Sequence, residues 1–312
     1  MYRDHSVGVV IPSYNERGFV GDVIRGIPEY VDRIYVVDDS STDGSWEEIL
    51  EAARADEDSR EDRRPQVVSA STYGPSVESR TEETVETDRV IAFRHHRNRG
   101  AGGAVKTGYF AALADELDIV ATVDGDGQMD ITELPRLLDP IVDRTAEYTK
   151  GNRLASAETR ADMPIFRLLG NVLLSTLTKI VSGYWHVGDS QNGYTAISGE
   201  ALSRVDITSL YEYYGYCNDL LVKLNVCGVR VADVPMPAVY GTETSSIGYT
   251  AYTTRVSWML VRNFGWRLQT KYGHRPVRHA LVIASIVVLT LGTGLLIGLS
   301  DVVLLEQPEW FP

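Results

Sequence analysis

Cysteine is almost absent from this sequence of 312 residues, which contains only Cys217 and Cys227. Two cysteines cannot build a disulfide scaffold, and neither has the second Cys or His pair that a zinc site requires. We therefore expect both to be packing residues. Basic residues are also few, because 30 Lys and Arg face 43 Asp and Glu, which gives a net charge of −13. A net charge of this sign argues against a protein that binds nucleic-acid phosphates, because such a protein presents a basic face.

Lysine is the scarcer of the two basic residues, with 5 of the 30. Arginine thus supplies most of the positive charge, while carboxylates exceed both. This usage resembles that of proteins from salt-loving archaea, whose surfaces replace Lys with Asp and Glu. We therefore predict a haloarchaeal source.

Long uncharged runs are confined to one place, residues 280–300. This run is long enough to cross a hydrocarbon core of about 30 Å, so it predicts a transmembrane helix, with a buried core helix as the alternative. Arg and Lys precede it and Asp and Glu follow it, which predicts a cytoplasmic N-terminal part. The N-terminus lacks the apolar region of a signal peptide. We expect an amphipathic juxtamembrane region at 246–279 and a short extracytoplasmic tail at 301–312.

The first 245 residues alternate strand-like and helix-like segments, which predicts an α/β fold with a mostly parallel sheet. Residues 56–88 interrupt the alternation with many acidic, Ser and Thr residues, and we expect a solvated insertion there. The clearest segments are short apolar runs typical of buried strands and periodic stretches typical of helices. They are the expected strands 7–11, 33–37, 89–93 and 119–123, and the expected helices 20–27 and 103–117.

Pairs of carboxylates follow two of the expected strands. Asp38 and Asp39 end one strand, and Asp124 and Asp126, separated by one Gly, end another. Ligands of open α/β sheets bind at the carboxyl ends of the strands. Two carboxylates at this spacing can share Mg²⁺ or Mn²⁺, which binds hard oxygen ligands and bridges to a substrate diphosphate. An ordinary Asp-Gly turn is the alternative for the second pair when it is taken alone.

Two common nucleotide-binding motifs are missing. The dinucleotide fingerprint Gly-x-Gly-x-x-Gly fails at its third glycine, where the chain has Val105, and there is no P-loop. We expect the glycines at 100, 102 and 103 to let a helix begin close to a nucleotide instead.

Four segments in this order resemble the inverting family 2 glycosyltransferases, and most closely the polyprenyl (dolichyl) phosphate hexosyltransferases. They are VVIPSYNE at 9–16, VVDDSSTDG at 36–44, NRGAGGA at 98–104 and DGDGQ at 124–128. The resemblance implies a nucleotide-diphospho-sugar transferase fold (GT-A, Rossmann-like) over residues 1–245, followed by interfacial helices. It departs from the mannosyl branch at 240–247, which lacks the Arg and the Ser-Lys pair found there. No Gln-x-x-Arg-Trp of a processive synthase occurs.

The resemblance also implies roles for individual residues. Those expected to bind the nucleotide sugar are Pro12, Tyr14, Glu16, Asp38, Asp39, Gly100, Asp124 and Gln128. Mg²⁺ or Mn²⁺ is expected on Asp124 and Asp126, so that Asp126 is catalytic, and Arg153 is expected to reach phosphate. The acceptor side is expected at Gln191, Asn192 and Gly193, with Asp219 as a candidate base.

The expected function is metal-dependent, inverting transfer of a hexose from a UDP- or GDP-sugar to dolichyl phosphate, at the cytoplasmic face of the cell membrane. The product would feed protein N-glycosylation. One alternative is transfer to a lipid-linked saccharide or another hydroxyl acceptor, for which Asp219 would act as the base. Another is a non-catalytic subunit that binds nucleotide sugars. The sequence leaves the sugar, the nucleotide, the lipid length and the oligomeric state open, a homo-oligomer included.

Overall fold

The computed structural model describes residues 1–58, 66–155, 165–236 and 249–273. The strands in these ranges form one nine-stranded sheet in the order β3-β4-β5-β2-β1-β6-β8-β7-β9. The strands are β1 (Val7–Ser13), β2 (Arg33–Asp38), β3 (Gln66–Val67), β4 (Thr81–Glu86), β5 (Val90–His95), β6 (Ile119–Thr122), β7 (Tyr148–Asn152), β8 (Thr195–Ser198) and β9 (Val231–Pro235).

The sheet is mixed, so the prediction of a mostly parallel sheet is correct for its four central strands and for the pair β7–β9. Strands β5, β2, β1 and β6 are mutually parallel. Toward one edge β4 is antiparallel to β5, because the two strands are joined by a hairpin too short for a crossover. Toward the other edge β8 is antiparallel to both β6 and β7. The reversed strand β8 therefore brings the end of the preceding loop to the carboxyl end of β6.

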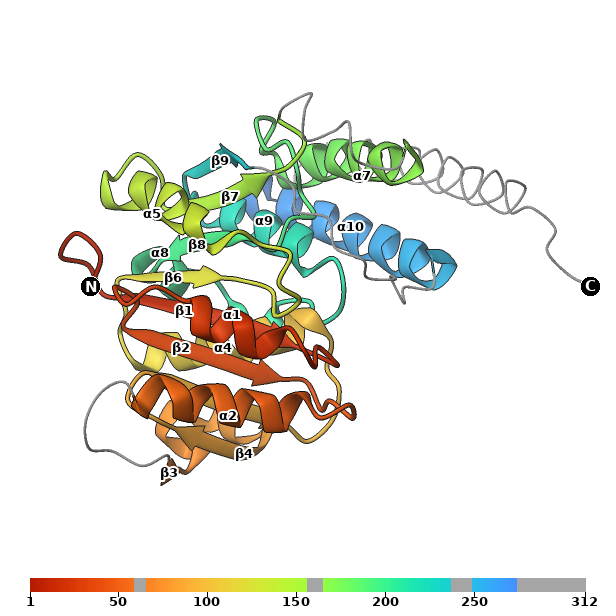
Figure 1. The fold of residues 1–312 in the computed structure, drawn as a ribbon. Helices are drawn as coiled ribbons and strands as arrows, with labels where there is room; N and C mark the ends of the chain where they lie inside the picture. The colour runs from red at the N-terminus through yellow and green to blue at the C-terminus, as the bar shows by residue number, and fades with distance from the viewer. Residues whose placement is uncertain (59–65, 156–164, 237–248, 274–312) are drawn as a thin grey trace, which may run out of the picture.

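Helices cover both faces of the sheet (Figure 1). One face carries α1 (Val20–Gly26), α2 (Ser45–Asp58) and α5 (Leu134–Val142), and its core includes Val9 and Ile11. The other face carries α4 (Ala101–Ala114), α8 (Gly199–Arg204) and α9 (Tyr216–Val226), and its core includes Val10. Successive residues of β1 thus enter opposite cores, which explains why the strand is apolar without interruption. Short 3₁₀ turns lie at η2 (Ile131–Glu133) and η3 (Ile207–Ser209).

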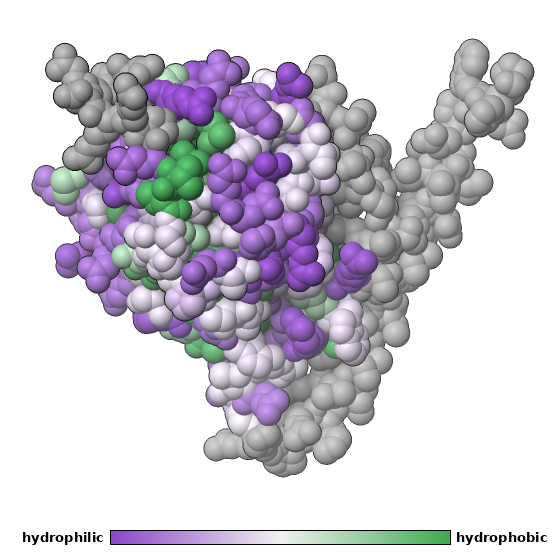
Figure 2. Space-filling view, turned by 90° about the horizontal axis from the view of Figure 1, so that it is seen from below, coloured by the Kyte–Doolittle hydropathy of each residue, from purple (hydrophilic) through white to green (hydrophobic). Residues whose placement is uncertain are grey.

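The prediction of a solvated insertion at 56–88 is wrong for the part that the structure describes. Residues 66–86 form β3, η1 (Ala70–Tyr73), α3 (Pro75–Glu78) and β4. Tyr73 and Val77 are buried in the core that contains α4. Three of the acidic side chains, Glu82, Glu83 and Glu86, belong to β4, the second strand from this edge of the sheet. Seen from this side, the surface is largely hydrophilic with a small hydrophobic patch (Figure 2).

Two long helices, α7 (Ile165–Ser182) and α10 (Tyr249–Tyr272), pack with α9 around a third apolar cluster that includes Leu174, Val222 and Met259. They project from the side of the sheet where β1 and β2 end (Figure 1). Among the described residues, no helix has both the length and the apolarity needed to cross a bilayer. The predicted span at 280–300 and the tail at 301–312 lie outside the described ranges.

Candidate functional site

Asp124 and Asp126 lie in the turn after β6, at the carboxyl end of the sheet. The amide of Gly125 donates to the carbonyl of Pro12 at 3.2 Å, which holds this turn against the end of β1. Asp126 Oδ1 accepts the amide of Gln128 at 2.9 Å. The structure therefore brings the second carboxylate pair beside the first predicted motif.

The carboxylates of Asp124 and Asp126 are both partly buried, and each disfavours ionisation of the other. Burial, followed by repulsion from Asp126, raises the pKa of Asp124 to about 7, although Arg153 and Lys150 oppose the shift. Burial also raises the pKa of Asp126. No cluster of three or more His, Cys, Asp or Glu suited to a metal occurs in the described residues. The pair fits Mg²⁺ or Mn²⁺ as a two-carboxylate site, because such ions take their remaining oxygen ligands from water and phosphate.

Arg153, at the end of β7, is fixed by a carboxylate that the sequence analysis did not identify. Its Nε donates to Asp189 Oδ2 at 2.7 Å, and Asp189 is completely buried. Burial by itself would raise the pKa of Asp189, but the charge and hydrogen bonds of Arg153 hold it below its ordinary value. Asp189 thereby holds the guanidinium of Arg153, which stays positively charged, close to Asp124 and Asp126.

The predicted acceptor-side loop packs directly on Asp124. A Cβ added at Gly193 would lie 2.8 Å from Asp124 Oδ2, so only glycine allows this approach. The carbonyl of Asn192 accepts a hydrogen bond from the ammonium of Lys150, which is fully buried. Gln191 donates from Nε2 to the side chain of Asn218 on α9 at 2.8 Å. Lys150 was missed because a lone lysine in a strand gives no signal of its position.

The predicted nucleotide side shows two different environments. Tyr14 is exposed at the surface, whereas Asp38 is buried beside Ser13 in the register of β1 and β2. Asp38 Oδ1 and Ser13 Oγ are buried without a hydrogen-bond partner in the described structure. Burial raises the pKa of Asp38. Unpaired buried polar atoms at strand ends indicate a place where a ligand could donate or accept.

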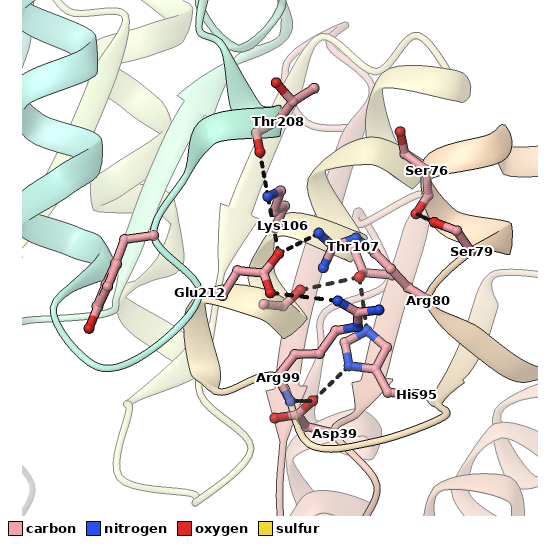
Figure 3. Close-up of polar contacts among 12 residues, drawn as sticks. Asp39, Ser76, Ser79, Arg80, His95, Arg99, Lys106, Thr107, Thr208 and Glu212 are labelled. Atoms are coloured by element: carbon pink, nitrogen blue, oxygen red, sulfur yellow. Dashed lines mark hydrogen bonds and ion pairs between the residues drawn. The ribbon is translucent and has the colours of Figure 1, made fainter.

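Asp39, by contrast, is occupied by protein donors. Its carboxylate accepts the amides of Arg99 and Gly100 at 2.8 and 2.7 Å, and His95 Nδ1 lies 2.7 Å from it (Figure 3). These contacts fix the start of α4. The prediction that Asp39 binds the base or ribose stays a prediction, and the contacts give it an anchoring function.

Asp219 is also fully engaged. Its Oδ2 accepts the amide of Tyr211 at 2.8 Å, and its Oδ1 accepts from Asn263 of α10 at 2.6 Å and from Lys223 at 3.1 Å. The side chain is completely buried. These contacts join α9 to α10 and do not favour Asp219 as a base, a function that remains a prediction.

Comparisons with known proteins agree with this architecture. The family model "Glycosyl transferase family 2" matches residues 8–71 and 75–205. A UDP-N-acetylglucosamine–dolichyl-phosphate N-acetylglucosaminyltransferase of Methanococcus voltae is 28% identical, over 76% of this chain and 87% of that protein. A dolichyl-phosphate hexose transferase of Haloferax volcanii is 29% identical, over 76% of this chain and 84% of that protein.

A solved structure shares the fold. Glucosyl-3-phosphoglycerate synthase from Mycobacterium tuberculosis, in complex with Mn²⁺, UDP and phosphoglyceric acid, superimposes with a TM-score of 0.56. The sequence identity is 18%, and the match covers 84% of this chain and 79% of that one. The likeness establishes the GT-A fold of nucleotide-sugar transferases, as the sequence predicts.

Gly193→Ala tests the contact between the acceptor-side loop and Asp124. The added methyl group would overlap the carboxylate, and overpacking of this kind costs about 1–3 kcal/mol. We expect Mn²⁺ to bind about tenfold more weakly, measured by electron paramagnetic resonance of free Mn²⁺. Gly265→Ala is the matched control, since no atom lies within 4 Å of its added Cβ. Equal Mn²⁺ affinity in both variants would contradict the contact.

Proposed function

Since the chain belongs to glycosyl transferase family 2, we propose that it transfers a hexose from a UDP- or GDP-sugar to dolichyl phosphate or a similar polyprenyl phosphate. The chain is related to dolichyl-phosphate sugar transferases over about three quarters of its length. The observation that carries the proposal is the convergence of Asp124, Asp126, the anchored Arg153 and Gly193 at one end of the sheet.

The main chemical requirement of such a transfer is to stabilise the negative charge of the leaving group. A nucleoside diphosphate leaves with two negative phosphates, and Mg²⁺ or Mn²⁺ held by Asp124 and Asp126 would neutralise that charge. Arg153 adds a fixed guanidinium that stays protonated. On the nucleotide side, the unpaired Asp38 and Ser13 atoms and the exposed ring of Tyr14 support contacts with base and ribose.

The acceptor that suits this site is a phosphate. A lipid phosphate is already ionised near neutral pH, so its oxygen can attack the anomeric carbon without a general base. Attack from the face opposite the leaving diphosphate inverts the configuration. The carboxylate of Asp219, which would have to serve as the base for a hydroxyl acceptor, already accepts from three donors. The geometry therefore favours the phosphate acceptor.

Asp126→Asn tests the reaction. Membranes containing the full chain are incubated with labelled UDP-glucose, UDP-N-acetylglucosamine or GDP-mannose and with dolichyl phosphate, and label is followed into lipid. We expect metal-dependent, acid-labile lipid label with one donor, and a loss of at least about a hundredfold in the variant.

The control for this assay is Asp143→Asn. It removes the same charge from an exposed pair with Arg3, which should leave the rate unchanged. Release of free nucleotide without lipid label would indicate a different acceptor. Equal activity of the two variants would refute the assigned metal site.

Helix α10 presents a surface suited to a membrane. Arg255, Trp258, Arg262 and Trp266 are exposed along one side, whereas Leu260 on the opposite side is buried. Arg and Trp at such spacing are typical of helices that lie at the lipid headgroups. We propose that α10 rests on the cytoplasmic membrane surface, so that the site meets a headgroup that cannot leave the bilayer. N-glycosylation as the destination of the product, and a haloarchaeal source, remain proposals of the same kind.

Tryptophan fluorescence tests this placement in the full chain reconstituted with brominated lipids. We expect bromine to quench Trp258 and Trp266, so the quenched fraction should fall in the Trp258→Phe/Trp266→Phe variant. Trp46→Phe is the control, because Trp46 is buried in the sheet core. An unchanged quenched fraction in the double variant would place α10 away from lipid.

A further inference from the structure

The segment Tyr211–Gly215 links η3 to α9 and lies against the first turn of α4. Its backbone is held at two neighbouring points. The amide of Tyr211 donates to Asp219 at 2.8 Å, and the carbonyl of Glu212 accepts the amide of Gly103 at 2.7 Å. The segment is therefore anchored to both α9 and α4.

The carboxylate of Glu212 provides the strongest anchor. It forms an ion pair with Arg80, lies 3.1 Å from Lys106 Nζ and lies 3.6 Å from Arg99 Nη1 (Figure 3). These cations come from three places: the turn before β4, helix α4 and the loop after β5. Arg80 and Lys106 are buried. Removing the charge of Glu212 would leave buried cations without compensation, which is strongly destabilising locally.

Gly100 lies between the backbone of Glu212 and Asp39, a residue of the predicted nucleotide side. The amide of Gly100 donates to Asp39, and a Cβ at Gly100 would lie 2.7 Å from the Glu212 carbonyl and 2.9 Å from Tyr213 Cδ1. Gly100 also has a φ of +82°, which disfavours any other residue. This glycine permits contact with Tyr211–Gly215, and its predicted contact with a nucleotide stays a prediction.

The segment carries two aromatic rings to the mouth of the site. Tyr213 and Tyr214 are 49% and 52% exposed. Tyr214 follows Tyr213, whose Cδ1 would lie 2.9 Å from a Cβ at Gly100, so the segment borders the predicted donor side. Arg255 of α10 lies 5.9 Å from the centre of the Tyr213 ring. The segment thus connects the sheet to α10 across the site.

We propose that Glu212 is a positioning residue: its ion pairs with Arg80, Arg99 and Lys106 hold Tyr211–Gly215 so that Tyr214 forms a wall of the nucleotide-sugar site. This inference rests on the proposed function. Arg80 makes the region that contains β3 and β4 part of the same arrangement. That region then supports the site across the sheet, in addition to closing an edge.

The test compares Glu212→Gln with Glu147→Gln in the full chain. Glu147 also pairs with two arginines, Arg204 and Arg230, and its side chain is 18% exposed against 26% for Glu212. We expect Glu212→Gln to raise the KM for the nucleotide sugar by about tenfold with a much smaller change in kcat. Glu212→Asp, which keeps the negative charge, should have a KM for the nucleotide sugar close to that of the wild type. Glu147→Gln should change neither constant.

Hydrogen exchange supplies a readout that does not depend on turnover. The amides of Gly103 and of Tyr211–Gly215 should exchange faster in Glu212→Gln and at the wild-type rate in Glu147→Gln. Tyr214→Ala should raise the same KM without changing exchange at Gly103. If Glu212→Gln fails to fold, Arg80→Gln removes one cation of the cluster and is expected to act in the same direction.

The outcomes separate this inference from the proposed function. If the wild type transfers no sugar, the affinity for UDP replaces KM as the measured quantity. Weaker UDP binding in Glu212→Gln alone then supports the positioning function, although the proposed transfer has failed. Equal effects of Glu212→Gln and Glu147→Gln on KM or UDP affinity, or unchanged exchange in Glu212→Gln, would overturn the inference.

Discussion

Burial of the Asp124 and Asp126 carboxylates after the same strand is the constraint on which the candidate site depends. Two carboxylates separated by one glycine are partly buried after β6, and such a pair is costly unless cations compensate it. Lys150 on β7 and Arg153 directly after it supply part of that compensation, although β8 lies between β7 and β6 in the sheet. The charge that they leave uncompensated is what a divalent cation, together with a diphosphate, would balance.

The mixed topology of the sheet determines which loop lies against Asp124. Strand β8 runs antiparallel between β6 and β7, so the loop before it arrives at the carboxyl end of β6 and lays Gly193 on Asp124. Asp189, in the same loop, then holds Arg153. A second charge cluster, centred on Glu212, holds the opposite wall of the site. Helices α7 and α10 extend from this same end of the sheet (Figure 1).

The sequence was sufficient to predict the strand ends that carry the site, because parallel strands deliver their C-terminal residues to one edge. Asp38, Asp124 and Arg153 are found at such ends. Lys150 and Glu212 could not be predicted, since their partners are 42 and 132 residues away and only the folded sheet brings them together. The acidic composition of 66–86 was misleading for a related reason. Glu82, Glu83 and Glu86 lie on β4, close to the edge of the sheet, where charge is as common as in a solvated loop, so composition does not distinguish the two.

We propose that Asp124 and Asp126 bind a divalent cation whose other ligands include the donor diphosphate. Electron–nuclear double resonance of Mn²⁺ bound to the full chain in the presence of UDP tests it most directly. We expect a phosphorus-31 coupling from the diphosphate in the wild type that is lost in Asp126→Asn. A Mn²⁺ spectrum without phosphorus coupling in the wild type, or one identical in both proteins, would contradict it.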